Sequence, residues 1–214
     1  MTSVAYSPCG KWIASGGGYG DNTVRIWDAA TGAAVGSPLR GDLPVRSVAF
    51  SPDSLHIAAG CGEYGKGEVL IFKLQESGDW EMQSECPLTG DKQVNCVAFS
   101  PDGNTLAAGD GGYEEAGNVR LYDVHTGEVK STLTGHSERV NCVVFSPNGK
   151  VIASCSGEGY NRDNSVRLWD AATGAAIGSP LTGHRGAVTR LEFRDASMLV
   201  SASNDGTTRF WDVE

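Results

Sequence analysis

The sequence predicts an all-β protein in which one four-stranded unit is repeated along the chain. Two distant segments are nearly identical: residues 21–41 read DNTVRIWDAATGAAVGSPLRG and residues 163–183 read DNSVRLWDAATGAAIGSPLTG. Apolar and polar residues alternate in short runs, and helical spacing is almost absent. Because self-similarity at a period of about 40 to 50 residues is typical of repeat architectures, we expect an array of short strands.

The first strand of each repeat is an alternating apolar segment that leads into a tight turn. These segments are VAYSPCG from Val4, VAFSPDS from Val48, VAFSPDG from Val97, VVFSPNG from Val143 and LEFRDAS from Leu191. Proline followed by Asp, Asn or Gly favours such turns, because proline presets one backbone dihedral and glycine accepts a positive one. The second strand is rich in small residues, and its five copies are WIASG, HIAAG, TLAAG, VIASC and MLVSA.

A loop separates the second strand from a third, which ends in an aromatic residue and usually Asp. The five copies of the third strand are TVRIWD, EVLIFK, NVRLYD, SVRLWD and TTRFWD. A turn then leads to a weaker fourth strand, expected at residues 33–39, 80–88, 128–133 and 175–181. We therefore predict a single domain over 1–214 with four complete units and three strands of a fifth, at about 1–40, 41–88, 89–133, 134–181 and 182–214.

These repeats resemble those of the WD-repeat β-propellers, in which the third strand of each four-stranded blade ends in Trp-Asp and each repeat begins with Gly-His. The Trp-Asp pair occurs at Trp27-Asp28, Trp169-Asp170 and Trp211-Asp212, is softened at Tyr122-Asp123 and is lost at Phe72-Lys73. The Gly-His pair occurs at Gly135-His136 and Gly183-His184, whereas Gly41-Asp42 and Gly90-Asp91 replace the histidine. The resemblance covers essentially the whole chain and implies an antiparallel β-propeller fold.

The blade count bears on whether the ring closes. The resemblance implies about seven blades, with the two chain ends pairing inside one blade, whereas this sequence supplies about five and a first strand at its beginning. An open arc would expose sheet edges and blade faces, which invites association. We therefore expect an incomplete ring, either because the sequence is a fragment of a longer chain or because self-association or another chain completes the ring; a small five-bladed ring that lacks one outer strand is the alternative.

The resemblance also implies a buried hydrogen-bonded tetrad within a blade. Its members in the fourth repeat are His136, Ser154, Asp163 and Trp169, and in the fifth they are His184, Ser201, Asp205 and Trp211. The same residue types occur in serine hydrolases, but no nucleophile elbow or oxyanion hole is evident in the sequence, so we interpret the tetrads as structural. Only Ser15, Asp21 and Trp27 of this set occur in the first repeat.

Residues that differ between repeats are the candidates for binding. Four of the loops between second and third strands are long, and each carries one tyrosine: Tyr19, Tyr64, Tyr113 and Tyr160. The acidic residues beside them are Glu63, Glu114, Glu115 and Glu158. These tyrosines either form a ring that docks a basic or amphipathic peptide or pack their own glycine-rich loops. By analogy with the family, Arg46, Asn95, Asn141 and Thr189 face the mouth of the central channel.

Composition restricts the function classes. The chain has 17 basic and 26 acidic residues and a net charge of -9, which disfavours nucleic acid and anionic membranes as partners. No metal-ligand spacing or cofactor motif is present, so no metal, cofactor or disulfide framework is expected. We expect a cytoplasmic, non-enzymatic scaffold that binds a partner protein or peptide through its loop-rich face. The alternative is the ligand-sensing or regulatory module of a larger NTPase-type signalling protein.

Overall fold

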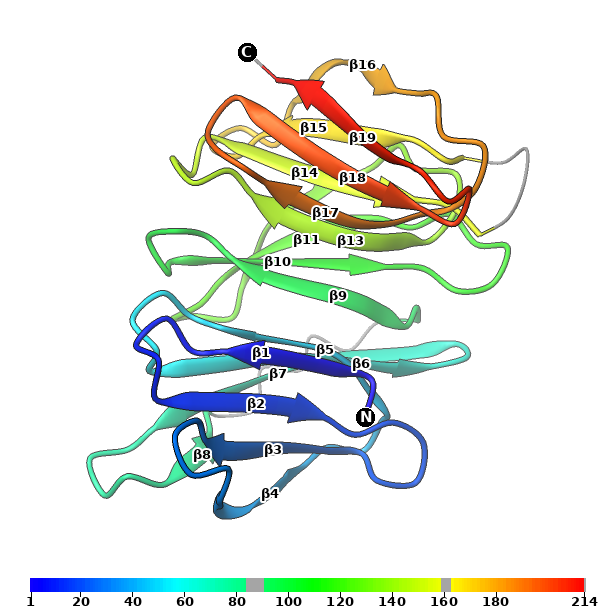
Figure 1. The fold of residues 1–214 in the computed structure, drawn as a ribbon. Coiled ribbons are helices and arrows are strands. Elements are labelled where there is room, and N and C mark those ends of the chain that lie inside the picture. The colour runs from blue at the N-terminus through cyan, green and yellow to red at the C-terminus, as the bar shows by residue number, and fades with distance from the viewer. Residues whose placement is uncertain (84–90, 159–162, 214) are drawn as a thin grey trace.

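A computed structural model describes residues 1–83, 91–158 and 163–213 of the chain. Within these ranges all regular structure is β-strand, in four sheets of four strands and one of three, and every pairing is antiparallel (Figure 1). No helix in the described part is long and apolar enough to cross a membrane. The predicted all-β fold with four complete units and a three-stranded fifth is therefore confirmed.

Each sheet is a blade whose strands follow one another in chain order. Blade one contains β1 (Ser3–Tyr6), β2 (Trp12–Gly16), β3 (Thr23–Asp28) and β4 (Ala34–Arg40). Blade two contains β5 (Val45–Phe50), β6 (His56–Glu63), β7 (Lys66–Leu74) and β8 (Trp80–Met82). Blade three contains β9 (Val94–Phe99), β10 (Thr105–Asp110), β11 (Val119–Asp123) and β12 (Val129–Leu133). Blade four contains β13 (Val140–Phe145), β14 (Val151–Ser156), β15 (Val166–Asp170) and β16 (Ala176–Leu181), and blade five contains β17 (Val188–Phe193), β18 (Met198–Ser203) and β19 (Thr208–Asp212).

One predicted loop is largely strand. In blade two β6 and β7 continue into a hairpin, with Glu63 opposite Lys66 and only Tyr64 and Gly65 at the turn. Gly65 has a φ of 73°, a left-handed conformation that glycine adopts without strain and that a two-residue hairpin turn requires. The predicted fourth strand at 80–88 is observed at 80–82, and residues 84–90 lie outside the described ranges.

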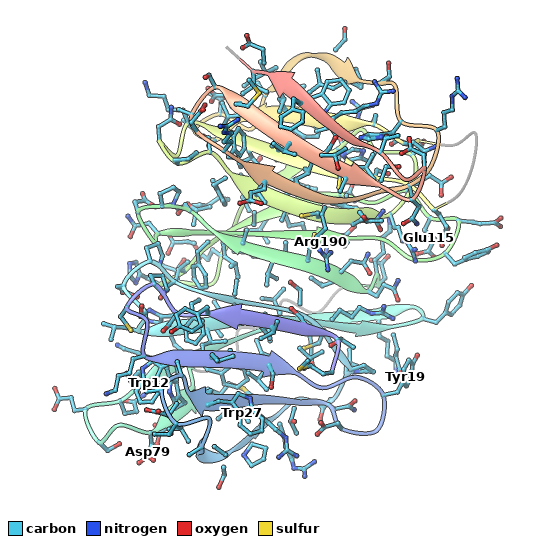
Figure 2. The ribbon with its side chains drawn as sticks, viewed as in Figure 1. Trp12, Tyr19, Trp27, Asp79, Glu115 and Arg190 are labelled. Atoms are coloured by element: carbon cyan, nitrogen blue, oxygen red, sulfur yellow. The ribbon has the colours of Figure 1, made fainter. Side chains whose placement is uncertain are left out.

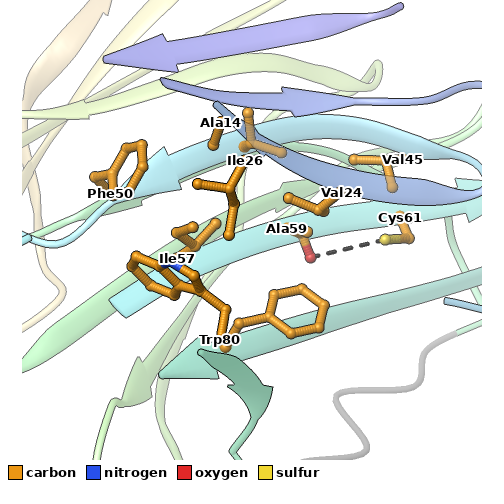
Figure 3. Packing of buried hydrophobic residues seen from close by; sticks show 11 residues of the cluster. Ala14, Val24, Ile26, Val45, Phe50, Ile57, Ala59, Cys61 and Trp80 are labelled. Carbon is orange, nitrogen blue, oxygen red and sulfur yellow. Dashed lines mark hydrogen bonds between the residues drawn. The ribbon is translucent and has the colours of Figure 1, made fainter. Parts of the chain in front are cut away.

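The core lies between the blades rather than inside any one of them. Ala14, Val24 and Ile26 of blade one pack against a second set of buried residues from blade two, among them Val48 and Ile57 (Figure 3). The same arrangement recurs between each later pair of neighbouring blades. Each blade is thus apolar on both faces, and burial of both faces requires a neighbour on each side.

The arc of blades is not closed. The inner strands pack in the order β1, β5, β9, β13 and β17, and the described residues of blades one and five share no sheet. Val4 and Tyr6 of blade one are each 60% exposed, whereas the equivalent Val48 and Phe50 of blade two are buried. At the other end Phe210 is 63% exposed, and β19 forms an outer edge where the other sheets have a fourth strand.

Candidate partner-binding face

The upper face is defined here as the end of the blades that carries the loops between second and third strands and the loops that enter each first strand. It includes the Gly-His segments of blades four and five. Figure 2 shows Tyr19 and Glu115 at this end of the molecule and Trp12 and Asp79 at the opposite end. Hydrogen-bonded tetrads hold the upper loops of blades four and five in place.

In blade four the tetrad links β14 and β15 to the loops that precede β13 and β15. The Trp169 indole donates from Nε1 to Ser154 Oγ at 2.9 Å, and His136 Nε2 lies 2.8 Å from the same oxygen. The other ring nitrogen, Nδ1, lies 3.1 Å from Asp163 Oδ2. Asp163 also accepts a hydrogen bond from the Ser137 backbone N–H. The carboxylate therefore ties the Gly-His loop to the loop before the third strand.

Blade five repeats this geometry almost atom for atom. Trp211 Nε1 donates to Ser201 Oγ at 2.8 Å, and His184 bridges that oxygen at 2.8 Å to Asp205 at 3.0 Å. In blade one the Trp27 indole donates to Ser15 Oγ at 2.8 Å. All eight predicted tetrad residues thus lie in two networks, four in each.

The chemistry of these networks differs from that of a hydrolase. Ser154 and Ser201 are fully buried, and each hydroxyl accepts from an indole N–H. Burial of the Asp163 carboxylate raises its pKa, but hydrogen bonds from His136 and Ser165 outweigh this effect and hold the pKa well below its usual value. A hydroxyl in such a position is out of reach of any substrate.

The tyrosines of the upper face project into solvent. Tyr19, Tyr64 and Tyr113 are 74%, 81% and 64% exposed, so their rings do not pack the loops that carry them. The interpretation that they pack locally is therefore wrong for these three, and Tyr160 lies outside the described residues. The backbone N–H of Glu114 donates to Glu158 Oε2 at 2.8 Å, which joins the acidic loops of blades three and four.

The predicted channel-mouth residues share a structural role that the sequence analysis did not anticipate. Arg46 Nε donates to the carbonyl of Gly62 at 2.8 Å, Asn95 Nδ2 to that of Gly111 at 2.8 Å, and Asn141 Nδ2 to that of Gly157 at 2.6 Å. Each bond spans 16 residues, from the start of the first strand to the end of the second. Three blades thus use equivalent side chains to fasten the same two strands.

These residues also come together around one cavity. Arg46, Asn95, Asn141 and Thr189 line a hollow of about 330 Å³ at the centre of the arc, which Thr2 of blade one completes. All five blades therefore contribute to it, although the arc is open. Burial lowers the pKa of Arg46 in this cavity, and an electrostatic interaction with Tyr19 opposes that decrease.

Sequence reasoning missed two arginines of the same cavity, Arg139 and Arg190. Arg139 lies two residues before Asn141, and Arg190 directly follows Thr189. Alignment of the five repeats could have identified Arg190, because the equivalent positions hold Ser3, Ser47, Cys96 and Cys142. A charged side chain where the other blades have small ones is the signal.

The thiols of Cys96 and Cys142 lie near Arg190, and Cys155 lies beside Cys142. Cys142 is opposite Cys155 in the β13–β14 register. The charge of Cys142 contributes to the raised pKa of Cys96, and Cys96 in turn contributes to the raised pKa of Cys155. The pKa of Cys142 is lowered to about 7, chiefly by a hydrogen bond with Cys155 and to a smaller extent by the charge of Arg190, although burial opposes this decrease. The cysteines of the described residues are unpaired, and no group of three His, Cys, Asp or Glu side chains there is arranged to hold a metal ion.

Comparison with known proteins identifies the class to which this fold belongs. The WD domain, G-beta repeat family matches residues 1–28, 127–170 and 176–212, which together make up half of the chain. The anaphase-promoting complex subunit 4 WD40 domain matches residues 48–148. The chain belongs to the WD-repeat family.

Individual relatives match only parts of the chain. Protein tipD of Dictyostelium discoideum is 37% identical over 96 residues, which is 45% of this chain and 15% of tipD. The F-box/WD repeat-containing protein sel-10 of Caenorhabditis elegans is 39% identical over 54 residues, 25% of this chain and 9% of sel-10. Nuclear distribution protein nudF of Aspergillus niger is 35% identical over 99 residues, 44% of this chain and 21% of nudF. The matches therefore span roughly a fifth or less of each relative.

Proposed function

We propose that this chain is a non-enzymatic scaffold that binds a partner protein or peptide through its upper face. WD-repeat domains in general mediate protein–protein interaction. The observation that carries the proposal for this chain is the set of three exposed tyrosines, Tyr19, Tyr64 and Tyr113, on equivalent loops of three blades. Exposed aromatic rings on rigid loops supply contact area at a low cost in side-chain entropy, and they are enriched among binding hot spots.

The charge around these rings specifies the partner further. Glu63, Glu114 and Glu115 stand beside Tyr64 and Tyr113 in the sequence and bring carboxylates to the loops of blades two and three. A basic or amphipathic segment complements such a surface and associates faster because of it. We therefore expect the partner to place basic residues over these loops.

The test is selection of a displayed random-peptide library on the purified chain. Peptides recovered on the wild type should lose most of their binding to a variant with Tyr19→Ala, Tyr64→Ala and Tyr113→Ala. A control is Leu55→Ala, because Leu55 is also an exposed apolar residue but lies in a turn at the opposite end of the blades. Both variants should keep the wild-type urea midpoint. Equal loss of binding in the two variants would count against the upper face.

A second mode of association rests on the open ends of the arc. Val4, Tyr6 and Phe210 are exposed at positions that a neighbouring blade covers elsewhere in the chain. Within the described residues, β19 has no fourth strand paired to its outer edge. We infer that these faces pack against further blades, and that in the isolated chain a second copy supplies them. Light scattering behind a sizing column should show a discrete oligomer that Phe210→Arg dissociates. A monomer at all concentrations would contradict this inference.

A further inference from the structure

The central cavity concentrates positive charge in an acidic protein. Arg46, Arg139 and Arg190 line it, although the chain as a whole carries a net charge of -9. They come from three different blades and from three different positions of the repeat. No single packing requirement of the repeat therefore accounts for the cluster.

Other blades show what the repeat itself needs at these positions. Where blade two has Arg46, blades three and four have Asn95 and Asn141, which make the same bond to a glycine carbonyl. Where blade five has Arg190, blades one and two have Ser3 and Ser47, whose hydroxyls accept from the backbone of the next blade. A short polar side chain suffices in both cases.

The third arginine is also dispensable for the repeat. At the position of Arg139, blade three has Gln93, blade two has Pro44 and blade five has Ala187. None of these carries a charge. The guanidinium groups are thus additions to the scaffold, and a role outside packing is the simplest account of them.

Most donors of the three guanidinium groups have no partner among the residues that the structure describes. Arg46 uses Nε on Gly62, and Arg190 uses Nη1 on the carbonyl of Thr189 at 3.1 Å. Within the described residues neither of them pairs with a carboxylate. Arg139 Nη1 lies 3.3 Å from Glu158 Oε1, but its buried Nε has no hydrogen-bond partner. An arginine offers five donors, so the cavity has an excess of them.

The cluster also carries an electrostatic cost. Burial lowers the pKa of Arg46, and the like charge of Arg139 lowers it further. An anion placed between the guanidinium groups would remove this repulsion and accept the unused donors, since arginine binds carboxylate and phosphate oxygens in a bidentate manner.

We propose that the central cavity binds an oxyanion, the carboxylate or phosphate of one side chain, presented by the peptide that occupies the upper face. The inference rests on the proposed function, because that peptide carries the anion. A volume of about 330 Å³ holds one such side chain. The acidic loops that surround the cavity, with Glu63, Glu114 and Glu115, repel a polyanion, so a single anionic residue flanked by basic ones fits this face better than nucleic acid does.

The experiment measures fluorescence anisotropy with three labelled peptides at low ionic strength. All three have two basic residues on either side of a central position, which is serine, glutamate or phosphoserine. The test variant combines Arg46→Asn, Arg139→Gln and Arg190→Ser, replacements taken from equivalent positions of this chain. The charge-matched control combines Lys73→Asn, Lys150→Gln and Arg194→Ser, which change exposed residues at the opposite end of the blades.

On the wild type and the control, the glutamate or phosphoserine peptide should bind about tenfold or more tightly than the serine peptide. The test variant should abolish that difference while keeping the wild-type circular dichroism spectrum. If it fails to fold, Arg190→Ser alone should reduce the difference at least about threefold. Preference for phosphoserine over glutamate identifies the anion as phosphate, and the reverse order identifies it as carboxylate.

Several results would overturn the inference. One is equal affinity of the wild type for all three peptides, or no binding of any of them. Another is a preference for the anionic peptides that survives in the test variant. Displacement of the anionic peptides by an equimolar amount of inorganic phosphate would assign the cavity to a free ion, and tighter binding of a labelled oligothymidylate would assign it to nucleic acid. Failure of the tyrosine contacts is separable, because the triple tyrosine variant weakens all three peptides by the same factor.

Discussion

Serine and tryptophan occur together at one hydrogen-bonded site within the blades, and from this pairing we predict how strongly the two positions are coupled in their effect on stability. Ser154 and Trp169 are bonded in blade four, whereas the equivalent residues are Ala59 and Phe72 in blade two. Blade three likewise has Ala108 and Tyr122. The chain thus has a hydrogen-bonded Trp–Ser pair at this site in blade four and an apolar Phe–Ala pair at the equivalent site in blade two. Conversion of blade four from one to the other should show strong coupling between the two positions.

The magnitudes follow from the contacts. Trp169→Phe removes one buried hydrogen bond and part of a ring, which should cost about 2 to 3 kcal/mol of unfolding free energy. Ser154→Ala leaves both the Trp169 Nε1–H and His136 Nε2 without their partner, at about 1 to 3 kcal/mol each. In the double variant phenylalanine replaces the indole, so no buried N–H is left without a hydrogen-bond acceptor at this position. Its cost should therefore fall about 1 to 2 kcal/mol short of the sum.

Urea unfolding followed by far-ultraviolet circular dichroism measures the cycle, provided that the four proteins have the same slope of free energy with urea. The matched control is Ser15 with Trp27 in blade one, where the indole makes the same bond but is less buried. Coupling there should be smaller. Additivity within about 0.5 kcal/mol in blade four would refute the reasoning, because it would mean that the indole and the hydroxyl contribute independently.

Three further predictions concern single groups. Hydrogen bonds keep the folded-state pKa of Asp163 below its unfolded value, so its contribution to stability is present above about pH 4 and is lost as the pH falls further. The free energy of unfolding of Asp163→Asn should therefore decrease less steeply with acid than that of the wild type. Parallel curves for the two proteins would contradict this. With the pKa of Cys142 at about 7, its alkylation by iodoacetamide should speed up about tenfold between pH 6 and pH 8 and then level off, whereas a continued rise beyond pH 9 would show an ordinary thiol. Arg46→Asn should leave the urea midpoint nearly unchanged, because asparagine makes the same bond in two other blades, and Arg46→Ala should cost about 1 kcal/mol; equal effects would show that the bond to Gly62 is not stabilising.

The repeat made much of this fold accessible from the sequence alone. Alternation locates strands because one face of each must be buried, and five aligned copies remove the ambiguity of any single one. The tetrad of His184, Ser201, Asp205 and Trp211 was implied by the resemblance to WD-repeat proteins, and the same residue types recur in blade four. The open arc followed from counting strands.

Features that depend on one loop or one side chain could not be predicted in this way. Two short strands or one glycine-rich loop are both compatible with residues 60–68, and the hairpin forms because Gly65 permits the turn. The exposure of Tyr64 depends on that hairpin extending beyond the blade. Alignment of the repeats distinguishes Arg190, because its position is small in every other blade, but only the convergence of the inner strands places its side chain in one cavity with Arg46 and Arg139.

The upper face therefore combines two opposite charges at different distances from the centre. Glu115 and its acidic neighbours lie on the loops, whereas Arg46 and Arg190 lie in the cavity. The two zones meet where Arg139 lies 3.3 Å from Glu158, so a partner that spans them encounters both signs of charge. A uniformly acidic segment is repelled by the loops before it reaches the arginines, and a uniformly basic segment is repelled by the arginines once it has docked. Only a segment whose charge alternates satisfies both zones, and the arrangement thereby rejects the highly charged polymers that either zone alone would bind.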